Sequence, residues 1–278
     1  MVTQKPIIAI TGSTGFVGTS LRKLLSHQNI SVISIARKKH KSFQSEKNLV
    51  VSDLDKISSL KCDTLIHLIG AGTQVKDSDY DLVNVKQTQK AIELCKRSNI
   101  KKIVYISGLG INDITTFGYF ISKLKAEKLI INSGLDYTIF RASYIVGTND
   151  PLTQNLKRQT KHGVIVIPGS GSYRLQPILI DDVCQIILTA ALDKKLSNKI
   201  IDLVGPKTIS FANYVKKFNK GKVKTKKISL EKAYFDALNN PKTAIYGVDD
   251  LNIMIGDFTS SHKKLEKLCG IKLKIPIL

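Results

Sequence analysis

The chain has 278 residues and a mass of 30.8 kDa, which is long for a single simple domain and enough to bury a large core with one subdomain appended. Hydrophobic residues make up 42% and the mean hydropathy is -0.02, so the composition excludes wholesale disorder. The formal net charge of +21 favours anionic partners in general. The basic residues are spread over both halves and are mostly lysines, so compositional bias explains them and nucleic acid is not an expected partner.

The sequence carries no sign of membrane insertion, secretion or metal binding. No apolar run reaches the roughly 18 residues of a membrane-spanning helix, and the opening MVTQKPIIAITG lacks the parts of a signal peptide. We therefore expect a soluble, cytoplasmic protein. The cysteines show neither CxxC spacing nor a histidine at zinc spacing, so we expect reduced core thiols and no metal site. They are Cys62, Cys95, Cys184 and Cys269.

The first half of the chain alternates short β-branched runs with longer amphipathic runs, the pattern of repeated βαβ units around a parallel sheet. Several short runs are almost continuously apolar, which suits strands that are covered on both faces. The expected strands are 7–10, 31–36, 49–52, 64–69, 103–107 and 137–140, and the expected helices are 15–26, 82–97 and 119–131.

After about residue 146 the rhythm changes. The stretch IVIPGSGSYRLQPILIDDV predicts loops and short strands that lead into a helix starting near Asp182, with Asp181 as its cap. These two carboxylates could also suggest an acid pair or a metal site, but a helix start explains them better. A strand over 199–204, a helix over 211–218 and a helical tail are expected to follow. The pattern indicates an α/β fold, a doubly wound parallel sheet with a smaller C-terminal α/β lobe.

A glycine-rich turn follows the first expected strand directly. In TGSTGFVG, Gly12 permits a tight bend, Gly15 lets backbone approach a pyrophosphate, and Gly18 allows the helix to pack closely on the strand. The helix amino terminus then holds the anion. This predicts an NAD(P)-binding Rossmann domain over 1–146, with the remaining Rossmann elements and a smaller substrate or partner lobe over 147–278, continuous with it. The other turn residues expected at the cofactor are Thr14, Phe16 and Val17.

The end of the second expected strand distinguishes the two nicotinamide cofactors. An acidic residue there pairs with a free ribose hydroxyl, whereas a cation accommodates a 2′-phosphate. The sequence reads Ala36-Arg37-Lys38-Lys39, so we expect NADP, with Arg37 as a cofactor-binding residue. NAD stays the alternative, because lysines are frequent throughout this chain.

These residues resemble the short-chain dehydrogenase/reductase superfamily, over almost the whole chain. TGSTGFVG is similar to the nucleotide turn of its extended and atypical branches, and RLQPILIDDV and IIDLVGPKTISFANYV resemble the branch that includes the nucleotide-binding accessory subunit of respiratory complex I. The resemblance implies an NAD(P)-binding Rossmann fold of the epimerase/dehydratase type. The positions that it implies at the cofactor are Asp53 and Leu54 near the adenine, Gly70 beneath the cofactor with Asn84 on the next helix, and Arg141 near the nicotinamide, where alanine replaces the usual following proline.

The reaction of this superfamily uses a Tyr-x-x-x-Lys pair, which Tyr119 and Lys123 supply at the expected place after the fifth strand. On a helix the two side chains share a face, so the ammonium can lower the tyrosine pKa and hold the nicotinamide ribose. Tyr119 could then exchange a proton with a substrate oxygen. In a lysine-rich chain the spacing means little, and the prediction depends on the position.

The hydroxyl that polarises the substrate oxygen in this superfamily has a weaker match. Ser107 is the candidate, but the extended enzymes place the hydroxyl nearer Leu109, and a hydrogen bond from Ser107 to backbone is the alternative. Thr115 or Thr116 could substitute for it. A site that lacks this hydroxyl would be slow.

Three further features have a functional and a structural interpretation. Arg174 resembles an arginine that meets substrate phosphate in nucleotide-sugar enzymes, and a surface ion pair with Asp181 or Asp182 is the alternative. His67 lies within an apolar strand, and we expect a satisfied core histidine. The lysines at 222, 224 and 226 alternate along an expected strand and would line one solvated face.

Two functions of different classes remain. The first is an NAD(P)-dependent oxidoreductase or epimerase/dehydratase-like enzyme that acts on a carbonyl or secondary alcohol of a small-molecule substrate. The alternative is a catalytically weak or inactive NAD(P)H-binding structural or regulatory subunit with a protein partner. Attachment of the lysine-rich lobe to an anionic membrane surface is a third, minor alternative.

Overall fold

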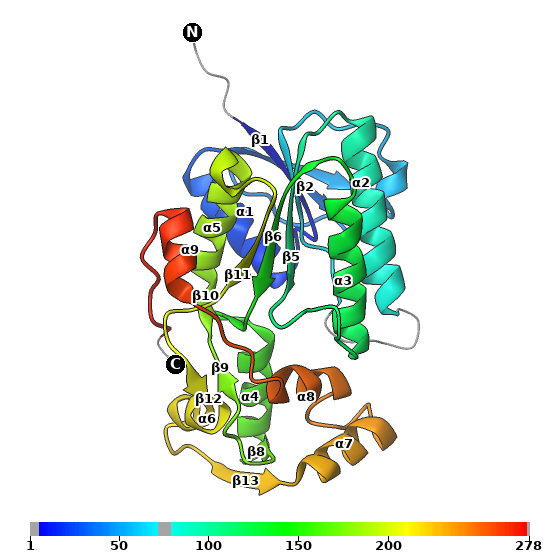
Figure 1. The fold of residues 1–278 in the computed structure, drawn as a ribbon. Helices are drawn as coiled ribbons and strands as arrows, with labels where there is room; N and C mark the ends of the chain where they lie inside the picture. Colours follow the sequence, from blue (N-terminus) through cyan, green and yellow to red (C-terminus); the bar gives the residue numbers. More distant parts are fainter. Residues whose placement is uncertain (1–5, 72–78, 277–278) are drawn as a thin grey trace.

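The computed structural model describes residues 6–71 and 79–276, and its centre is a seven-stranded parallel sheet (Figure 1). The strand order is β11-β6-β5-β4-β1-β2-β3, so β1 and β4 are neighbours although β2 and β3 lie between them in sequence. Ligands of such sheets bind at the carboxyl ends of the strands, where the order reverses. The strands are β1 (Ile7–Thr11), β2 (Ser31–Ala36), β3 (Glu46–Val50), β4 (Thr64–His67), β5 (Lys102–Gly108), β6 (Asp136–Ala142) and β11 (Lys199–Leu203).

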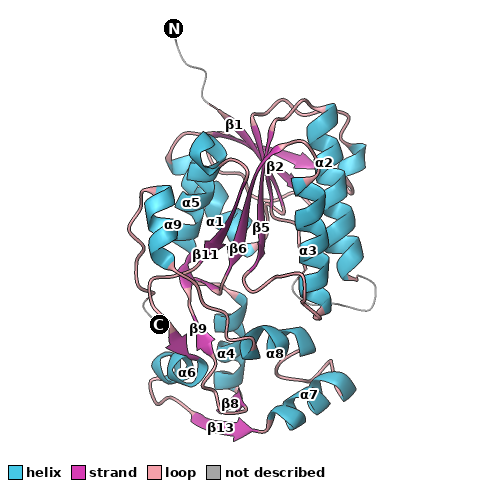
Figure 2. Cartoon of the chain, viewed as in Figure 1, coloured by secondary structure: helices cyan, strands magenta, loops and turns pink. Residues whose placement is uncertain are grey.

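Helices cover both faces of the sheet, which confirms the predicted doubly wound fold (Figure 2). One face carries α1 (Phe16–His27), α5 (Ile180–Leu192) and α9 (His262–Cys269), and the other carries α2 (Gln87–Arg97) and α3 (Gly118–Ile131). The central strands between them are buried on both sides, as in β4, where all four residues are inaccessible or nearly so, whereas the edge strand β3 has no fully buried residue. The core therefore forms two apolar layers, one on each face of the sheet.

A small lobe packs beyond the carboxyl ends of the strands and has its own apolar core, which includes Leu156, Ile165 and Phe211 (Figure 1). Its strands form two-stranded pairs, β9 with β12 and β8 with β13, while β7 and β10 form a further pair. The helices are α4 (Pro151–Lys161), α6 (Phe211–Asn219), α7 (Leu230–Asn239) and α8 (Val248–Ile255). The strands are β7 (Ile145–Val146), β8 (Val164–Pro168), β9 (Arg174–Leu175), β10 (Ile178–Leu179), β12 (Ile209–Ser210) and β13 (Lys224–Ile228).

Most of the expected bounds differ from the observed ones by one or two residues, and three of the differences have a clear physical reason. The third strand is Glu46–Val50 rather than 49–52, because Asp53 ends the extended segment by capping a 3-10 turn, Leu54–Lys56. The helix expected to start near Asp182 begins at Ile180, with both aspartates in its first turn, where the helix dipole favours negative charge. The helix expected over 82–97 is divided into a π-helical segment, Asp81–Lys86, and α2.

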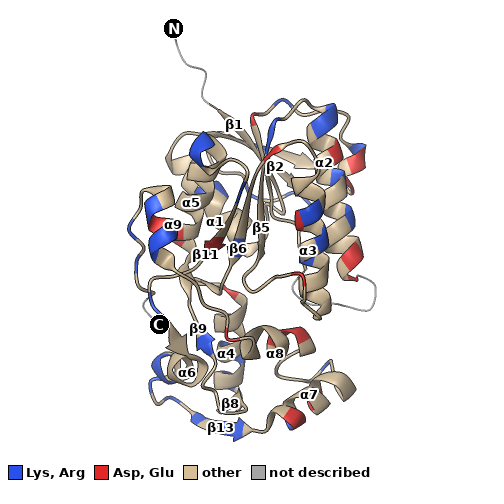
Figure 3. Cartoon of the chain, viewed as in Figure 1, with Lys and Arg blue, Asp and Glu red and all other residues tan. Residues whose placement is uncertain are grey.

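The basic residues occur on the sheet layer and on the small lobe (Figure 3). Lys224 and Lys226 are exposed at alternating positions of β13, as predicted, whereas Lys222 is exposed but lies before the strand begins. The neighbouring Lys227 is exposed as well. All four cysteines are free thiols; three are buried and Cys62 is half-buried. In the described residues no helix is long and apolar enough to cross a membrane, and no group of three His, Cys, Asp or Glu side chains gathers as metal ligands would.

Candidate nucleotide and substrate site

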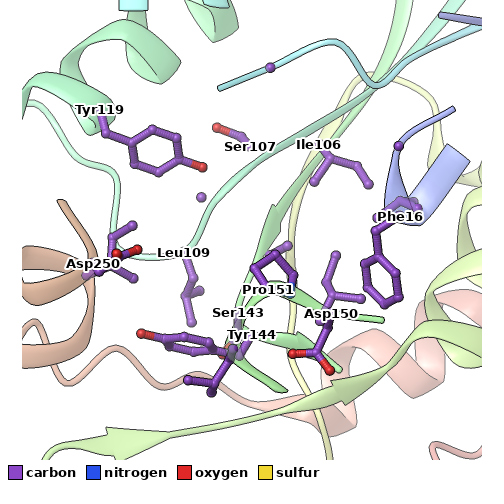
Figure 4. A pocket seen from close by; sticks show the side chains of 18 of the residues that line it. Phe16, Ile106, Ser107, Leu109, Tyr119, Ser143, Tyr144, Asp150, Pro151 and Asp250 are labelled. Atoms are coloured by element: carbon purple, nitrogen blue, oxygen red, sulfur yellow. The ribbon is translucent and has the colours of Figure 1, made fainter. Parts of the chain in front are cut away.

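A cavity of about 630 Å³ opens between the carboxyl ends of the strands and the small lobe. Its sheet side is formed by the glycine-rich turn after β1 and by the ends of β5 and β6, and its lobe side by residues of α4 and α8. Side chains from both parts point into it (Figure 4), among them Phe16, Ser107, Tyr119, Tyr144, Asp150 and Asp250. The cavity therefore lies where the topology of the sheet predicts a ligand.

The glycine-rich turn is shaped by close backbone packing. Gly12 has φ +66°, and a Cβ there would lie 2.7 Å from the carbonyl carbon of Leu68 at the end of β4. A Cβ at Gly18 would collide with the carbonyl oxygen of Gly12. The Gly15 amide donates to that same oxygen at 3.0 Å. Gly12 and Gly18 thus have the roles that the sequence predicted, since both positions require the absence of a side chain.

The turn leads into a helix whose amino terminus faces the cavity. Helix α1 has twelve residues, Gly15 is its N-cap, and no side chain caps it. Gly15, Phe16 and Val17 line the cavity, whereas Thr14 is exposed and is not among the described lining residues. Free amide groups and the helix dipole together make such an end a site for a phosphate group.

The residues predicted to bind the adenine end of the cofactor lie beside β2 and β3. Arg37 is exposed at the end of β2, together with Lys38 and Lys39. The Asp53 carboxylate pairs with the Lys90 ammonium at 2.6 Å, and this contact holds the pKa of Asp53 below its usual range. Leu54 is buried in the core.

Gly70 is held between the side chains of Asn84 and Lys123. The Asn84 amide brackets the next residue, because its Oδ1 accepts from the Ala71 amide at 2.9 Å and its Nδ2 donates to the Ala71 carbonyl at 3.2 Å. A Cβ at Gly70 would lie 3.0 Å from the Lys123 Nζ atom. The structure therefore brings Gly70, Asn84 and Lys123 together at the edge of the cavity.

Lys123 is buried and does not act on Tyr119 in the way that the sequence suggested. Its Nζ atom donates to the Tyr105 hydroxyl and to the Ile106 carbonyl, both at 3.1 Å, and lies 4.7 Å from the centre of the Tyr105 ring. Burial lowers the pKa of Lys123 to about 8. The pKa of Tyr119 is raised to about 12, by burial first and then by the negative charge of Asp249, so the expected lowering by Lys123 is wrong for this arrangement.

Tyr119 lies in the cavity at the same end as Ser107 (Figure 4). Ser107 is 3% exposed, and its hydroxyl has no hydrogen-bond partner among the described residues. The alternative in which this hydroxyl bonds to backbone is therefore wrong. Leu109 lines the cavity, whereas Thr115 and Thr116 are not among the described residues that line it.

Two predicted arginines are engaged by carboxylates. Arg141 forms a two-point contact with Glu127, at 3.1 and 2.7 Å, and is not among the described lining residues, although the next residue, Ala142, lines the cavity. Arg174 does line the cavity, but its Nη2 atom lies 2.7 Å from the carboxylate of Asp257. The ion pair expected for Arg174 is present, with a different partner from Asp181 or Asp182.

His67 is a satisfied core histidine, as predicted. It is fully buried, its Nδ1 lies 2.7 Å from the Thr11 hydroxyl, and its Nε2 lies 3.3 Å from the Thr88 hydroxyl. Burial, with a contribution from the charge of Lys123, lowers its pKa to about 3. The ring stacks on Tyr105, which occupies the facing position in β5.

Sequence reasoning missed Tyr105 and Tyr80. The available signal was a hydroxyl-bearing residue, Tyr105, inside an apolar strand. In the sheet Tyr105 lies next to His67. The Tyr80 ring packs edge-on against Tyr119, with centroids 5.8 Å apart, and its hydroxyl donates to Asp249. Tyr80 and Asp249 are 169 residues apart, so no local pattern indicates this contact.

Known proteins of related sequence include mitochondrial subunits. The chain is 25% identical over 219 residues to NADH dehydrogenase (ubiquinone) 1 alpha subcomplex subunit 9 of Arabidopsis thaliana, covering 72% of this chain and 54% of that protein. It is 21% identical over 215 residues to the NADH-ubiquinone oxidoreductase 40 kDa subunit of Neurospora crassa, covering 73% and 56%. The chain thus spans little more than half the length of these relatives, and the predicted resemblance to the complex I branch is confirmed.

Solved structures share the fold over nearly the whole chain. A nucleoside-diphosphate-sugar epimerase from Staphylococcus aureus matches with a TM-score of 0.76 at 16% identity, covering 96% of this chain and 97% of that one. UDP-glucuronic acid 4-epimerase from Bacillus cereus, in complex with NAD, matches with a TM-score of 0.69 at 19% identity, covering 93% and 99%. The sequence model of the family described as NAD(P)H-binding matches residues 12–172, more than half of the chain. The protein therefore belongs to the NAD(P)H-binding family.

Proposed function

We propose that the protein is an NADP-dependent oxidoreductase that reduces a carbonyl group, with Tyr119 as the proton donor and Ser107 as the hydroxyl that polarises the carbonyl oxygen. The observation that carries the proposal is the Ser107 hydroxyl, which is buried, has no partner among the described residues, and lies at the same end of the cavity as Tyr119. A buried hydroxyl without a partner costs free energy, and a substrate oxygen would satisfy it.

The residues present fit a nicotinamide dinucleotide. The uncapped amino terminus of α1 opens on the cavity, and Gly15 leaves the approach to its amides clear of a side chain. Lys123, beside Gly70, would hold ribose hydroxyls. When bound, the cofactor supplies or accepts a hydride at the substrate carbon. Arg37 at the end of β2 supports NADP over NAD, because its exposed guanidinium would meet a 2′-phosphate.

The protonation state of Tyr119 suits reduction. A tyrosine phenol is protonated at neutral pH, and the pKa of Tyr119, raised to about 12, keeps it so while making it a weaker acid. Its proton passes to the carbonyl oxygen as hydride transfer gives that oxygen the charge and basicity of an alkoxide. Ser107 would donate a hydrogen bond to the same oxygen. The phenolate that results regains its proton from solvent through the open side of the cavity.

The test is the rate of NADPH oxidation over a panel of carbonyl compounds. We expect Tyr119→Phe to lower kcat/KM by about a hundredfold or more and Ser107→Ala by about a hundredfold. NADPH affinity, measured by calorimetry alongside NADH, should change less than about threefold in both variants. Tyr137→Phe is the matched control, because it removes a phenol oxygen outside the cavity. Equal rates in wild type and Tyr119→Phe would end the proposal.

A second candidate is a cofactor-binding subunit without turnover. It is supported by relatives named as NADH dehydrogenase subunits and by Lys123, which contacts Tyr105 and leaves the Tyr119 pKa high. On this alternative NADPH raises the melting temperature by mass action, and no carbonyl compound accelerates its oxidation. Native gels of cell extract would then show the protein in a larger assembly that survives Tyr119→Phe.

A further inference from the structure

A positively charged side chain, that of Arg158, lies on the lobe side of the cavity. Arg158 belongs to the last turn of α4 and lines the cavity, although it is exposed to solvent. Among the described residues, no side chain or backbone group forms a hydrogen bond or an ion pair with its guanidinium. The N–H groups of this guanidinium are therefore available to a ligand.

The chain contains few arginines, so the contacts of each one are informative. It has 37 lysines and six arginines. Four of the six form at least two polar contacts through the guanidinium, and these are Arg22, Arg97, Arg141 and Arg174. For Arg37 and Arg158 the described part of the chain provides no such contact. Arg37 is proposed above to meet the 2′-phosphate of NADP. A guanidinium binds carboxylates and phosphates through two parallel N–H groups, so Arg158 is equally suited to an anionic group of a ligand.

The second arginine of the cavity, Arg174, is less available than Arg158. Its Nε and Nη2 atoms lie 2.8 and 2.7 Å from Oδ2 of Asp257, and its backbone amide donates to Oδ1 of the same carboxylate. The pair is exposed, so water weakens it. An anion at Arg174 would nevertheless face the negative charge of Asp257, whereas an anion at Arg158 displaces no ion pair. The sequence assigned the substrate anion to Arg174, and the contacts favour Arg158.

Asp250, in the first turn of α8, is the lining carboxylate whose charge interacts with Arg158. Its Oδ2 atom accepts from the Gly247 amide at 2.9 Å. Burial raises the pKa of the Asp250 carboxyl, and the positive charge of Arg158 acts against that rise. The two groups attract each other without forming an ion pair, so Asp250 competes only weakly with an anion for the guanidinium. Both oxygens of Asp150, the other acidic residue among the described lining residues, accept backbone amides.

The two ends of a substrate would meet different parts of the protein. Ser107 and Tyr119 come from the end of β5 and the start of α3, on the sheet side, whereas Arg158 comes from α4 of the lobe. A carbonyl compound with an anionic group can place its oxygen at the first two residues and its charge at the third. Ile253 and Met254 of α8 also line the cavity and offer apolar contacts to the carbon chain.

From this arrangement we infer that Arg158 binds an anionic group of the substrate, and that the substrate is a carbonyl compound bearing a carboxylate or a phosphate. The inference rests on the proposed function, because it names the substrate class of the same site.

The test measures binding to the protein saturated with NADP⁺, which cannot reduce a carbonyl. Calorimetry would compare heptan-2-one, 6-oxoheptanoate and 5-oxohexyl phosphate, which share a methyl ketone and four methylene groups and differ only in the terminal methyl, carboxylate or phosphate. The homologues with two and six methylene groups cover other spans. For at least one length we expect an anion to bind at least about tenfold more tightly than the neutral ketone, and the better anion identifies the group. Ketones that bind as tightly as both anions at every length would overturn the inference.

Charge variants assign the preference to Arg158, with melting curves to show that each folds. Arg158→Gln should bring the affinity of the anion to within about threefold of that of the ketone. Lys157→Gln is the matched control, because it removes the same charge from the same helix at a residue that is not among the described lining residues, and it should keep the preference. Asp250→Asn keeps an acceptor for the Gly247 amide and removes the competing charge, so it should tighten anion binding by about threefold or more. A full preference in Arg158→Gln, or one lost equally in Lys157→Gln, would overturn the inference.

Two further readouts separate this inference from the cofactor and from catalysis. NADPH affinity should change less than about threefold in Arg158→Gln, and a loss of tenfold or more would mean that the guanidinium binds the cofactor instead. If the anion binds through Arg158 but NADPH is not oxidised, the proposed function fails and the anion site stands. If neutral ketones are reduced as efficiently as their anionic counterparts and Arg158→Gln changes neither rate, the proposed function stands and the anion site fails.

Discussion

The hydrogen bonds between His67 and its neighbours determine which ring nitrogen of His67 carries the proton. The Thr88 hydroxyl donates to the Asn84 carbonyl at 2.6 Å, so its oxygen can accept from His67 Nε2. The Thr11 hydroxyl then donates to Nδ1. This network assigns the neutral ring with its proton on Nε2, which agrees with a pKa lowered to about 3.

The buried neutral ring predicts a loss of stability on acidification. Between pH 6.5 and about 3 the unfolded chain binds a proton at position 67 and the folded chain does not, so the free energy of unfolding falls with falling pH, by up to about 1.4 kcal/mol per pH unit from this group. His67→Asn lacks the ionisable ring and should be less stable at pH 7 but show a flatter pH dependence. Urea unfolding at pH 7, 6 and 5 measures both.

The control for His67 is His27→Asn, since His27 is exposed in the last turn of α1. It should keep the wild-type slope. Equal slopes in wild type and His67→Asn would contradict a neutral native ring.

At the scale of helices and strands, the sequence pattern predicted the bounds of those elements that are determined by residues close together in the chain. The strand over 31–36 has the predicted bounds, because β1 and β3 pair with it on both sides, Val32 and Ile35 are buried in the core, and the exposed basic run 37–39 follows it. The strand at 46–50 was misplaced, because it lies at the edge of the sheet and none of its residues is fully buried. Edge strands lack the apolar pattern from which bounds are predicted.

In the candidate site, too, some features could be predicted from local sequence and others could not. The glycine turn, Tyr119 and Lys123 could be predicted because each lies at one junction of a strand and a helix. The contacts that orient them could not. Lys123 binds Tyr105 rather than acting on Tyr119, and Arg174 binds a carboxylate 83 residues away, so chain packing decides both. Sequence spacing carries no information on such pairs.

The close packing of the glycine-rich turn after β1 predicts that a methyl group added at Gly18 lowers stability and NADPH affinity, whereas one added at Gly118 does not. Gly18→Ala places a Cβ against the Gly12 carbonyl oxygen, so the helix must move off the turn. We expect a loss of about 2–3 kcal/mol of stability and at least about tenfold weaker NADPH binding. Gly118→Ala is the control, since its Cβ would meet Tyr80 at 3.6 Å, an ordinary contact. Thermal melting and calorimetry measure both, and wild-type NADPH affinity in Gly18→Ala would contradict the assigned role of the turn.

At the scale of the whole molecule, the chain returns from the lobe to the sheet layer more than once. Helix α5 covers the sheet after β10, strand β11 pairs with β6, and α9 packs on the same face after the last lobe helix. The buried Asp182 of α5 ties in the C-terminal segment, because its Oδ2 accepts from the Lys274 amide at 2.8 Å.

The bond from the Lys274 amide to Asp182 predicts how the C-terminal segment is held. Asp182→Ala leaves that amide without its partner, so we expect about 1–3 kcal/mol lower stability and faster hydrogen exchange over 271–276. Asp182→Asn keeps an acceptor and should retain protection. Exposed Asp181, in the same turn, provides the control variant Asp181→Ala. Exchange mass spectrometry decides, and unchanged protection in Asp182→Ala would show that packing alone holds the segment.

Strand β11 and helix α9 are synthesised late, and this affects how the protein folds during translation. The edge of the sheet at β6 can gain its neighbour once residues 199–203 have left the ribosome, by which time much of the lobe has already been synthesised. Until then the nascent Rossmann domain has an unpaired sheet edge at β6 and one partly uncovered face. Such exposed surfaces bind chaperones and other incompletely folded chains. Slow translation between residues 142 and 199 would prolong that exposure, and synonymous codon changes in this interval are where the yield of folded protein should be most sensitive.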